Sequence, residues 1–209
     1  LRGVDILSTY LDHAATTPMH PEALDAMRPW QETHFANPSG SHRAARLARQ
    51  AVDEARELIA ASLGVNSGDV VFTGGGTESD NYAISGSVRS RGGLAVCSAI
   101  EHHAVLDPVQ HHGGVTVAVT RDGQIDTDDL RVVLNDASSS GQHVPVVSVM
   151  TVNNEVGSVN DIAKVAAIVR ELAPAAWLHT DAVQAACWID LSEITQHVDL
   201  LSLSAHKFG

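Results

Sequence analysis

One aspartate and one lysine in this sequence have the side chains and the spacing for carbonyl and amine chemistry. Asp181 follows the apolar run Trp177–Thr180, and Lys207 follows the apolar run Leu200–Ser204. If the two runs are neighbouring parallel strands, both side chains lie at one edge of the sheet, around one pocket. A lysine there can form a Schiff base with an aldehyde, and an acid can keep a pyridine nitrogen protonated, as the cofactor pyridoxal phosphate (PLP) requires. An ordinary salt bridge is the alternative for the pair alone.

Three polar residues flank this pair and favour the pocket over the salt bridge. In an extended run, Ser204 and His206 share a face, so both can reach one phosphate while Lys207 points elsewhere. Gln184 lies three residues after Asp181, about one helical turn along, where its amide can donate to a phenolic oxygen of the ring. A salt bridge does not account for these neighbours.

A glycine-rich turn, Gly74–Gly76, precedes Thr77 at the start of a candidate helix. Glycines let the backbone approach a ligand closely, and a helix N-terminus attracts an anion, so Gly76 and Thr77 are candidates for phosphate binding. The alternative is that Thr77 is only a helix cap, with Glu78 in the first turn. The turn lacks the lysine of a P-loop and does not match the dinucleotide-binding glycine pattern.

A histidine and an asparagine follow two other candidate strands. His102 can lie against a flat aromatic ligand or transfer protons near neutral pH, or it can be a solvent-facing residue at a helix start. His103 has no such argument behind it. Asn153 and Asn154 can donate to a ligand oxygen, or they can satisfy the backbone of a turn.

Short apolar runs alternate with longer amphipathic segments along most of the chain. The short runs predict strands at Val70–Thr73, Leu94–Ser98, Val115–Val119, Val144–Val149, Trp177–Thr180 and Leu200–Ser204. The longer segments predict helices at Thr77–Ser90, His103–His112, Thr127–Leu134 and Ile162–Leu172. This alternation is typical of an α/β fold with a mainly parallel sheet and helices on both faces.

The clearest helical pattern, Ser41–Leu63, precedes the first predicted strand. Gly64 stands where a C-terminal cap belongs. Residues 1–40 are expected to form an extended N-terminal segment. The predicted apolar stripe of the helix consists of Ala44, Leu47, Ala51, Ala55, Leu58 and Ile59.

Composition and charge exclude several classes of protein. A chain of 209 residues that is 44% hydrophobic can bury a substantial core. Its net charge of -12 and 13 scattered basic residues argue against a nucleic-acid partner. No signal peptide or membrane span is expected. The two cysteines, Cys97 and Cys187, are expected to be buried thiols, which suits the reducing cytoplasm.

Histidine is abundant, with 12 residues, but its spacing argues against a metal site. The pairs His102-His103 and His111-His112 fall at opposite ends of one predicted helix, about 13 Å apart. One metal ion cannot use both ends, and no Cys–His spacing indicates structural zinc.

Taken together, the motifs resemble the cysteine desulfurases, a group of class-V aminotransferase-like PLP enzymes of fold type I. The resemblance runs in order along the chain, through Tyr10–Pro18, Asn37–Ser39 with His42, Phe72–Asn81, Glu101-His102, Val152–Gly157, His179–Gln184 and Ser202–Phe208. It implies a homodimeric enzyme that converts L-cysteine to L-alanine. The sulfur would pass through an enzyme persulfide to scaffold proteins of iron–sulfur cluster assembly.

The resemblance also implies a role for each matching residue. Lys207 would be the Schiff-base lysine and Asp181 the partner of the pyridinium nitrogen, while His102 would stack on the ring and assist proton transfer. Lys207 and His102 would then be the catalytic residues. Gln184 would bind the phenolic oxygen. The other cofactor contacts would come from Thr77, Ser204, His206 and Asn154.

Members of this family continue for about as many residues again. The resemblance therefore implies that residues 41–209 are an incomplete PLP-binding large domain, without the C-terminal small domain. The nucleophilic cysteine and the arginine that binds the substrate carboxylate would lie in that further half, and so would a strand that pairs beside Val70–Thr73. Alone, this chain is expected to be poorly stable and inactive as a desulfurase.

The sequence motifs are also compatible with other functions. A selenocysteine lyase, a kynureninase-like enzyme or an aminotransferase of the same class would share the lysine, the aspartate and the sheet. A non-catalytic phosphate-binding or scaffold domain is the alternative from a different class. Binding of PLP with a yellow colour would separate the enzymes from the scaffold.

Overall fold

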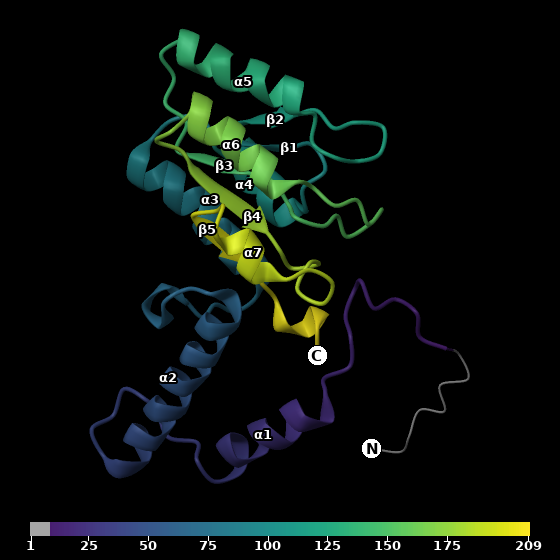
Figure 1. Cartoon of the computed structure of the whole chain (residues 1–209). Coiled ribbons are helices and arrows are strands. Elements are labelled where there is room, and N and C mark those ends of the chain that lie inside the picture. Colours follow the sequence, from purple (N-terminus) through teal and green to yellow (C-terminus); the bar gives the residue numbers. More distant parts are fainter. Residues whose placement is uncertain (1–8) are drawn as a thin grey trace.

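One parallel sheet organises the molecule in the computed structural model, which describes residues 9–209. Five strands pair in the order β2-β1-β3-β4-β5, and every pair is parallel (Figure 1). The strands are β1 Val96–Ser98, β2 Val115–Val117, β3 Val146–Ser148, β4 Trp177–Asp181 and β5 Leu200–Ser202. Five of the six predicted strands are confirmed; four are shorter than the apolar runs suggested, whereas β4 extends one residue further, to Asp181.

Two pairs of helices cover the two faces of the sheet. On one face α3 (Gly76–Arg91) packs against α4 (His103–His111), and on the other α5 (Thr127–Ser139) packs against α6 (Ile162–Leu172) (Figure 1). The predicted fold class, an α/β fold with helices on both faces, is thereby confirmed. The remaining elements are α1 Pro21–Glu32, α2 Arg43–Leu63, α7 Leu191–Thr195 and the short 3-10 helices η1 Ser67–Asp69 and η2 Ala205–Lys207.

Alternation of side chains along the strands explains why these runs are apolar throughout. Val96 and Val147 belong to the core cluster beneath α5 and α6. Their chain neighbours Cys97 and Val146 belong to the cluster beneath α3 and α4. Because successive side chains point to opposite faces, a strand covered on both sides needs an apolar residue at nearly every position.

Local side chains fix where several helices begin and end. Asp126 caps α5 by accepting from the amides of Asp128 and Asp129, and Asp161 caps α6 by accepting from the amide of Lys164. Gly64 ends α2 in the left-handed conformation, with φ of 67°, as its position in the sequence predicts.

Two predictions for the first part of the chain are wrong. Pro21–Glu32, within the segment expected to be extended, forms α1, because Pro21 starts a helix without losing a needed amide donor. Val70–Thr73 forms no strand. Within residues 9–209 no strand lies beyond β5, so these residues have no ladder partner, and the Val71 side chain is 77% exposed.

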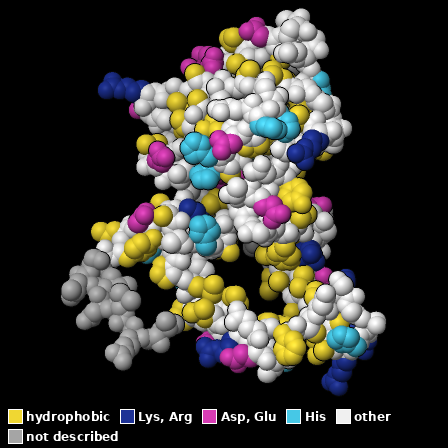
Figure 2. All heavy atoms as spheres, turned by 180° about the vertical axis from the view of Figure 1, so that it is seen from behind, with side chains coloured by type: hydrophobic (Ala, Val, Ile, Leu, Met, Phe, Trp, Pro, Cys, Tyr) yellow, Lys and Arg dark blue, Asp and Glu magenta, His cyan; other side chains and the backbone are white. Residues whose placement is uncertain are grey.

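The predicted apolar stripe of α2 is also wrong. The helix buries Ala45, Ala48 and Ala60, whereas Leu47 and Leu58 are exposed. Helix α1 buries no residue, and apolar side chains gather on the arm that α1 and α2 form below the sheet (Figures 1 and 2). Of the two thiols expected to be buried, Cys97 is buried but Cys187 is exposed, because it lies in the turn after β4.

None of the helices within residues 9–209 has the length and apolar character needed to cross a membrane.

The α5–α6 core gives a first testable prediction. Leu134 is buried on α5, whereas Val132 on the same helix is 55% exposed. We expect Leu134→Ala to lower the free energy of unfolding by about 2–5 kcal/mol, because it leaves a cavity in a packed core. Val132→Ala, the matched control, should change it by less than about 1 kcal/mol. Urea unfolding followed by circular dichroism measures both, and equal effects would contradict the assigned packing.

Candidate functional site

A cavity of about 370 Å³ lies at the carboxyl ends of the strands, where open parallel sheets bind their ligands. Its volume falls within the range of small-molecule sites. All nine residues predicted from the sequence to bind a cofactor line this one cavity: Gly76, Thr77, His102, Asn154, Asp181, Gln184, Ser204, His206 and Lys207. The structure therefore brings the whole predicted set together, while their roles stay predictions.

Asp181 and Lys207 reach the cavity from adjacent strands, as expected. Asp181 ends β4 opposite Ser202 of β5, and Lys207 ends the 3-10 helix that follows β5. Lys207 Nζ donates to the carbonyl oxygens of Ala14 and Ala15, at 2.6 and 2.9 Å, rather than to Asp181. Both side chains thus serve one cavity, and the salt-bridge alternative does not describe their contacts.

The segment around Ala14 closes one side of the cavity, which the residue-by-residue reasoning did not anticipate. Gln184 Nε2 donates to the Ala14 carbonyl oxygen at 2.8 Å, the same atom that Lys207 binds. The Thr17 amide donates to the His206 carbonyl oxygen at 3.0 Å. These contacts hold a stretch from the start of the chain against its last residues. Its polar backbone groups carry no periodic signal, so only the motif resemblance pointed to this stretch.

The N-terminus of α3, with Gly76 and Thr77, lines one part of the cavity. Gly75 has φ of 152°, a conformation that other residues rarely adopt. A Cβ atom on Gly76 would lie 3.1 Å from Val183 Cγ2 and 3.4 Å from Ser204 Cβ, so the backbone comes close only because a side chain is absent. Gly75, not Thr77, is the helix cap. Thr77 therefore has its hydroxyl free of the capping role proposed as the alternative.

The predicted alternation of Ser204, His206 and Lys207 is wrong. Ala205–Lys207 forms the 3-10 helix η2 instead of continuing the strand, so Lys207 does not point away from its two neighbours. All three side chains line the cavity. The Lys207 amide donates to the Ser204 carbonyl oxygen at 3.1 Å, which closes this turn. A turn concentrates three polar side chains where a strand would have separated them.

His102 is both a residue at a helix start and a residue of the cavity, the two roles considered for it. Its Nδ1 caps α4 by accepting from the Ala104 amide at 3.1 Å, and the ring also lines the cavity. Because Nδ1 is an acceptor, the neutral ring carries its proton on Nε2. His103 is exposed and lies 3.3 Å from Asp107, outside the cavity.

The two asparagines have separate roles. Asn153 is buried, and its Oδ1 accepts from the amides of Glu155 and Val156, both at 2.9 Å, so it holds the turn. Asn154 lines the cavity. The sequence alone could not divide these functions between neighbours.

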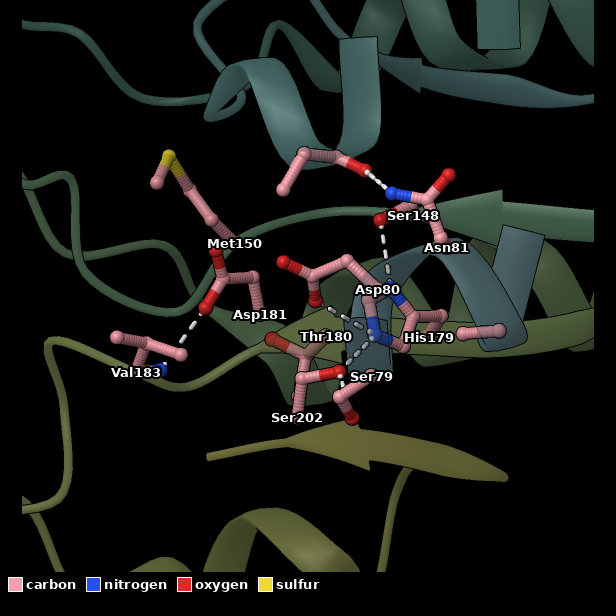
Figure 3. A network of polar contacts seen from close by, with 12 residues as sticks. Ser79, Asp80, Asn81, Ser148, Met150, His179, Thr180, Asp181, Val183 and Ser202 are labelled. Atoms are coloured by element: carbon pink, nitrogen blue, oxygen red, sulfur yellow. Dashed lines mark hydrogen bonds and ion pairs between the residues drawn. The ribbon is translucent and has the colours of Figure 1, made fainter. Parts of the chain in front are cut away.

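A buried polar network, which the sequence analysis does not predict, lies beneath the cavity (Figure 3). His179 Nδ1 is 2.8 Å from Ser148 Oγ, and its Nε2 is 3.0 Å from Ser202 Oγ and 3.6 Å from Asp80 Oδ1. Ser202 Oγ in turn is 2.8 Å from Ser79 Oγ. The alternation of polar residues at His179, Asp181 and Ser202 on neighbouring strands was the signal that could have revealed this layer.

Burial dominates the acid–base properties of this layer. It lowers the pKa of His179 to about 3, so the ring is neutral. It raises the pKa of Asp80 to about 7 and that of Glu101 to about 8, with the Asp181 charge adding to both. Burial also raises the pKa of Asp181, against the opposing effects of the Val183 amide, His102 and Lys207.

Among residues 9–209, no three His, Cys, Asp or Glu side chains are grouped so that they could hold a metal ion.

A family model described as aminotransferase class-V matches residues 9–209. The chain is 40% identical over 207 residues to the cysteine desulfurase IscS of Dictyoglomus turgidum and 41% identical over 212 residues to an IscS-like cysteine desulfurase of Mycobacterium tuberculosis. These matches cover 95% and 96% of this chain but 50% and 52% of the relatives. The chain thus spans about half the length of the curated relatives it matches.

Solved structures give the same result. The structure of SspA in complex with cysteine matches with a TM-score of 0.83 and 34% identity, covering 96% of this chain and 58% of that one. A NifS-like protein from Rickettsia africae matches with a TM-score of 0.83 and 28% identity, covering 96% and 54%. The resemblance to cysteine desulfurases that the motifs suggested is confirmed.

The buried carboxyl of Glu101 predicts how stability depends on pH. Its pKa is about 8 in the folded state and near 4.5 when unfolded, so between these values only the folded state keeps the proton. Stability should therefore fall as pH rises from about 5 to 8. Glu101→Gln keeps an oxygen for the Ser98 hydroxyl and the Met150 amide but cannot ionise. The free energy of unfolding of the variant should therefore rise relative to that of the wild type across this pH range, by an amount on the order of a few kcal/mol.

Urea unfolding at several pH values measures this difference. Glu57→Gln on the exposed side of α2 is the control and should follow the wild type at every pH. If the plots of unfolding free energy against pH ran parallel for the wild type and Glu101→Gln, folding would not raise the pKa of Glu101, and the prediction would be wrong.

Proposed function

The chain belongs to the class-V aminotransferase family, and from that premise we propose that it forms the cofactor-binding part of a PLP-dependent cysteine desulfurase. Class-V aminotransferases and cysteine desulfurases are PLP-dependent enzymes. One observation carries the proposal: the lysine, the aspartate and the seven other predicted residues line a single cavity. The proposed reaction converts L-cysteine to L-alanine and transfers the sulfur to a cysteine thiol as a persulfide.

The residues of the cavity fit PLP in three respects. The α3 N-terminus, with the Gly76 backbone and Thr77, offers donors and positive potential for a phosphate. Ser204 and His206, which follow β5, add two further polar side chains. Asp181 is 6% exposed, and among the described residues only the Val183 amide donates to its side chain, at 2.9 Å. A buried carboxylate with so few donors is stabilised by a cation such as a protonated pyridine nitrogen. Lys207 supplies the amine.

Bound PLP supplies an electron sink for the charge released at the substrate Cα. The chain's own residues would bind, orient and move protons around it. Asp181 would hold one proton at the ring nitrogen by its negative charge. Gln184 would donate to the phenolic oxygen, and Asn154 would donate to the cofactor from the turn after β3.

His102 and Lys207 would carry the proton transfers. His102 has Nδ1 committed to the Ala104 amide, so Nε2 is the atom that would give or take a proton in the cavity. Lys207 is held half-buried by the carbonyl oxygens of Ala14 and Ala15. Its Nζ would bond to the cofactor aldehyde and, when released, act as a base.

The thiol that accepts sulfur is proposed to lie outside this chain. Cys97 is fully buried in the sheet, and burial raises the pKa of its thiol far above the usual range, so it is a poor nucleophile. Cys187 is exposed, but its Sγ lies 3.8 Å from the Lys207 carbonyl oxygen and outside the residues that line the cavity.

The wider biology is part of the same proposal. We propose that the complete enzyme is a homodimer, that it passes sulfur to scaffold proteins of iron–sulfur cluster assembly, and that it works in the cytoplasm. Two relatives that carry the name IscS or IscS-like support the assembly role.

The chain has two lysines, Lys164 and Lys207, which allows a sharp test of the proposal. We expect the complete protein to turn yellow with PLP, and borohydride to fix the cofactor on Lys207, the lysine in the cavity. Lys207→Ala should abolish the fixed label and lower sulfide release from L-cysteine by at least about a hundredfold. Absorbance, peptide mapping and a sulfide assay measure these outcomes.

Lys164→Arg is the matched control, because Lys164 lies on the exposed side of α6. It should keep both the label and the activity. A label on Lys164, or a colourless wild-type protein after incubation with PLP, would overturn the proposed function.

A further inference from the structure

Asp80 lines the cavity but belongs to none of the predicted contacts. It extends from the second turn of α3 and is only 1% exposed. Its Oδ1 is buried without a hydrogen-bond partner among the described residues. A buried carboxyl oxygen that no donor reaches is costly in its charged form, so its place beside the cavity calls for an explanation.

Among the described residues, no cation is one of the groups that shift the pKa of Asp80. The nearest basic group is the His179 ring, 3.6 Å away, and burial keeps that ring neutral by lowering its pKa to about 3. Ser202, the remaining polar neighbour, lowers the pKa of Asp80, but less than burial raises it. Figure 3 shows Asp80 with two of the titratable groups around it, Asp181 and His179 on β4. The others are Glu101 and His102 before α4 and Lys207 on η2.

Asp181, in contrast, has groups that favour its charge. The Val183 amide donates to it, and His102 and Lys207 both favour its ionised form. The charge of Asp181 in turn disfavours a charge on Asp80. Two carboxyls in one desolvated space cannot both ionise at neutral pH, and the one with more donors and cations takes the charge.

We propose that Asp80 and Asp181 form a buried carboxyl pair that carries one negative charge at neutral pH, with the charge on Asp181 and the proton on Asp80. Asp80 is thereby a positioning residue, because it sets how much negative charge faces a cationic ring bound in the cavity. This inference rests on the proposed function for the identity of the ring. The carboxyl pair itself exists with or without the cofactor.

Ionisation of Asp80 would add a second negative charge next to the ring. Above pH 7 this charge would favour protonated forms of the cofactor and of its bond to Lys207. The absorption band of bound PLP reports those protons. Asp80→Asn keeps the shape and polarity of the neutral acid but can never supply the second charge, so it isolates this effect.

The first experiment titrates the absorption spectrum of the complete PLP-loaded protein from pH 5 to 10. We expect the spectral midpoint of Asp80→Asn to lie about 0.5–1 pH unit below that of the wild type, with PLP affinity at pH 6.5 changed by less than about threefold. Asp181→Asn, the benchmark, should lower PLP affinity by at least about tenfold. An unchanged midpoint, or an affinity loss in Asp80→Asn as large as in Asp181→Asn, would overturn the inference.

The second experiment needs no cofactor and separates this inference from the proposed function. An unfolded Asp80 ionises near pH 3.8 and the folded one near 7, so the wild type should lose stability relative to Asp80→Asn as pH rises through this range. The increase in unfolding free energy that Asp80→Asn causes should be smaller in an Asp181→Asn background, because the neighbouring charge is absent there. A gain that is equal in both backgrounds would refute the pair. A wild-type protein that shows this coupling but never binds PLP would refute only the proposed function.

Discussion

The cost of burying carboxyl groups governs the arrangement of this site. Asp80, Glu101 and Asp181 all lie within a small desolvated region, and each has a raised pKa for that reason. A protein can retain such groups only as neutral acids or as partners of a cation. Lys207 and His102 favour the ionised form of Asp181, so the proposed carboxyl pair carries its single negative charge on Asp181. Asp181 lines the cavity, so the proposed charge lies where a bound ligand would contact it.

The sheet makes this arrangement possible because its strands are parallel and adjacent. Parallel strands deliver their carboxyl ends to one edge, so residues distant in the sequence meet there without long loops. Thr77 and Lys207 are separated by most of the chain yet line one cavity. The core clusters on both faces hold the strands in register, and contacts such as those of His179 with Ser148 and Ser202 link side chains near their ends.

Most of the fold and of the cavity could be predicted from the sequence because both depend on local patterns. Apolar runs such as Val146–Ser148 and Asp caps such as Asp161 act over a few residues, and strand-end positions follow from them. The failures have nonlocal causes. Within residues 9–209, Val70–Thr73 has strand composition but no strand to pair with, and Leu47 and Leu58 of the predicted α2 stripe are exposed. The role of Asp80 depends on contacts with two strands beyond its own helix, which no periodicity reveals.

The polar layer also implies a conflict between stability and function. Gly75 holds a backbone conformation that side chains disfavour, and among the described residues Asp80 Oδ1 and Glu101 Oε2 are buried without a hydrogen-bond partner. Each feature lowers the stability of the folded chain, and neutral isosteres would remove part of that cost. Such features persist where a bound group compensates them or where their charge state is used. Because these costs lie around one cavity and the packed clusters elsewhere are apolar, the strain of this fold is concentrated where its chemistry would occur.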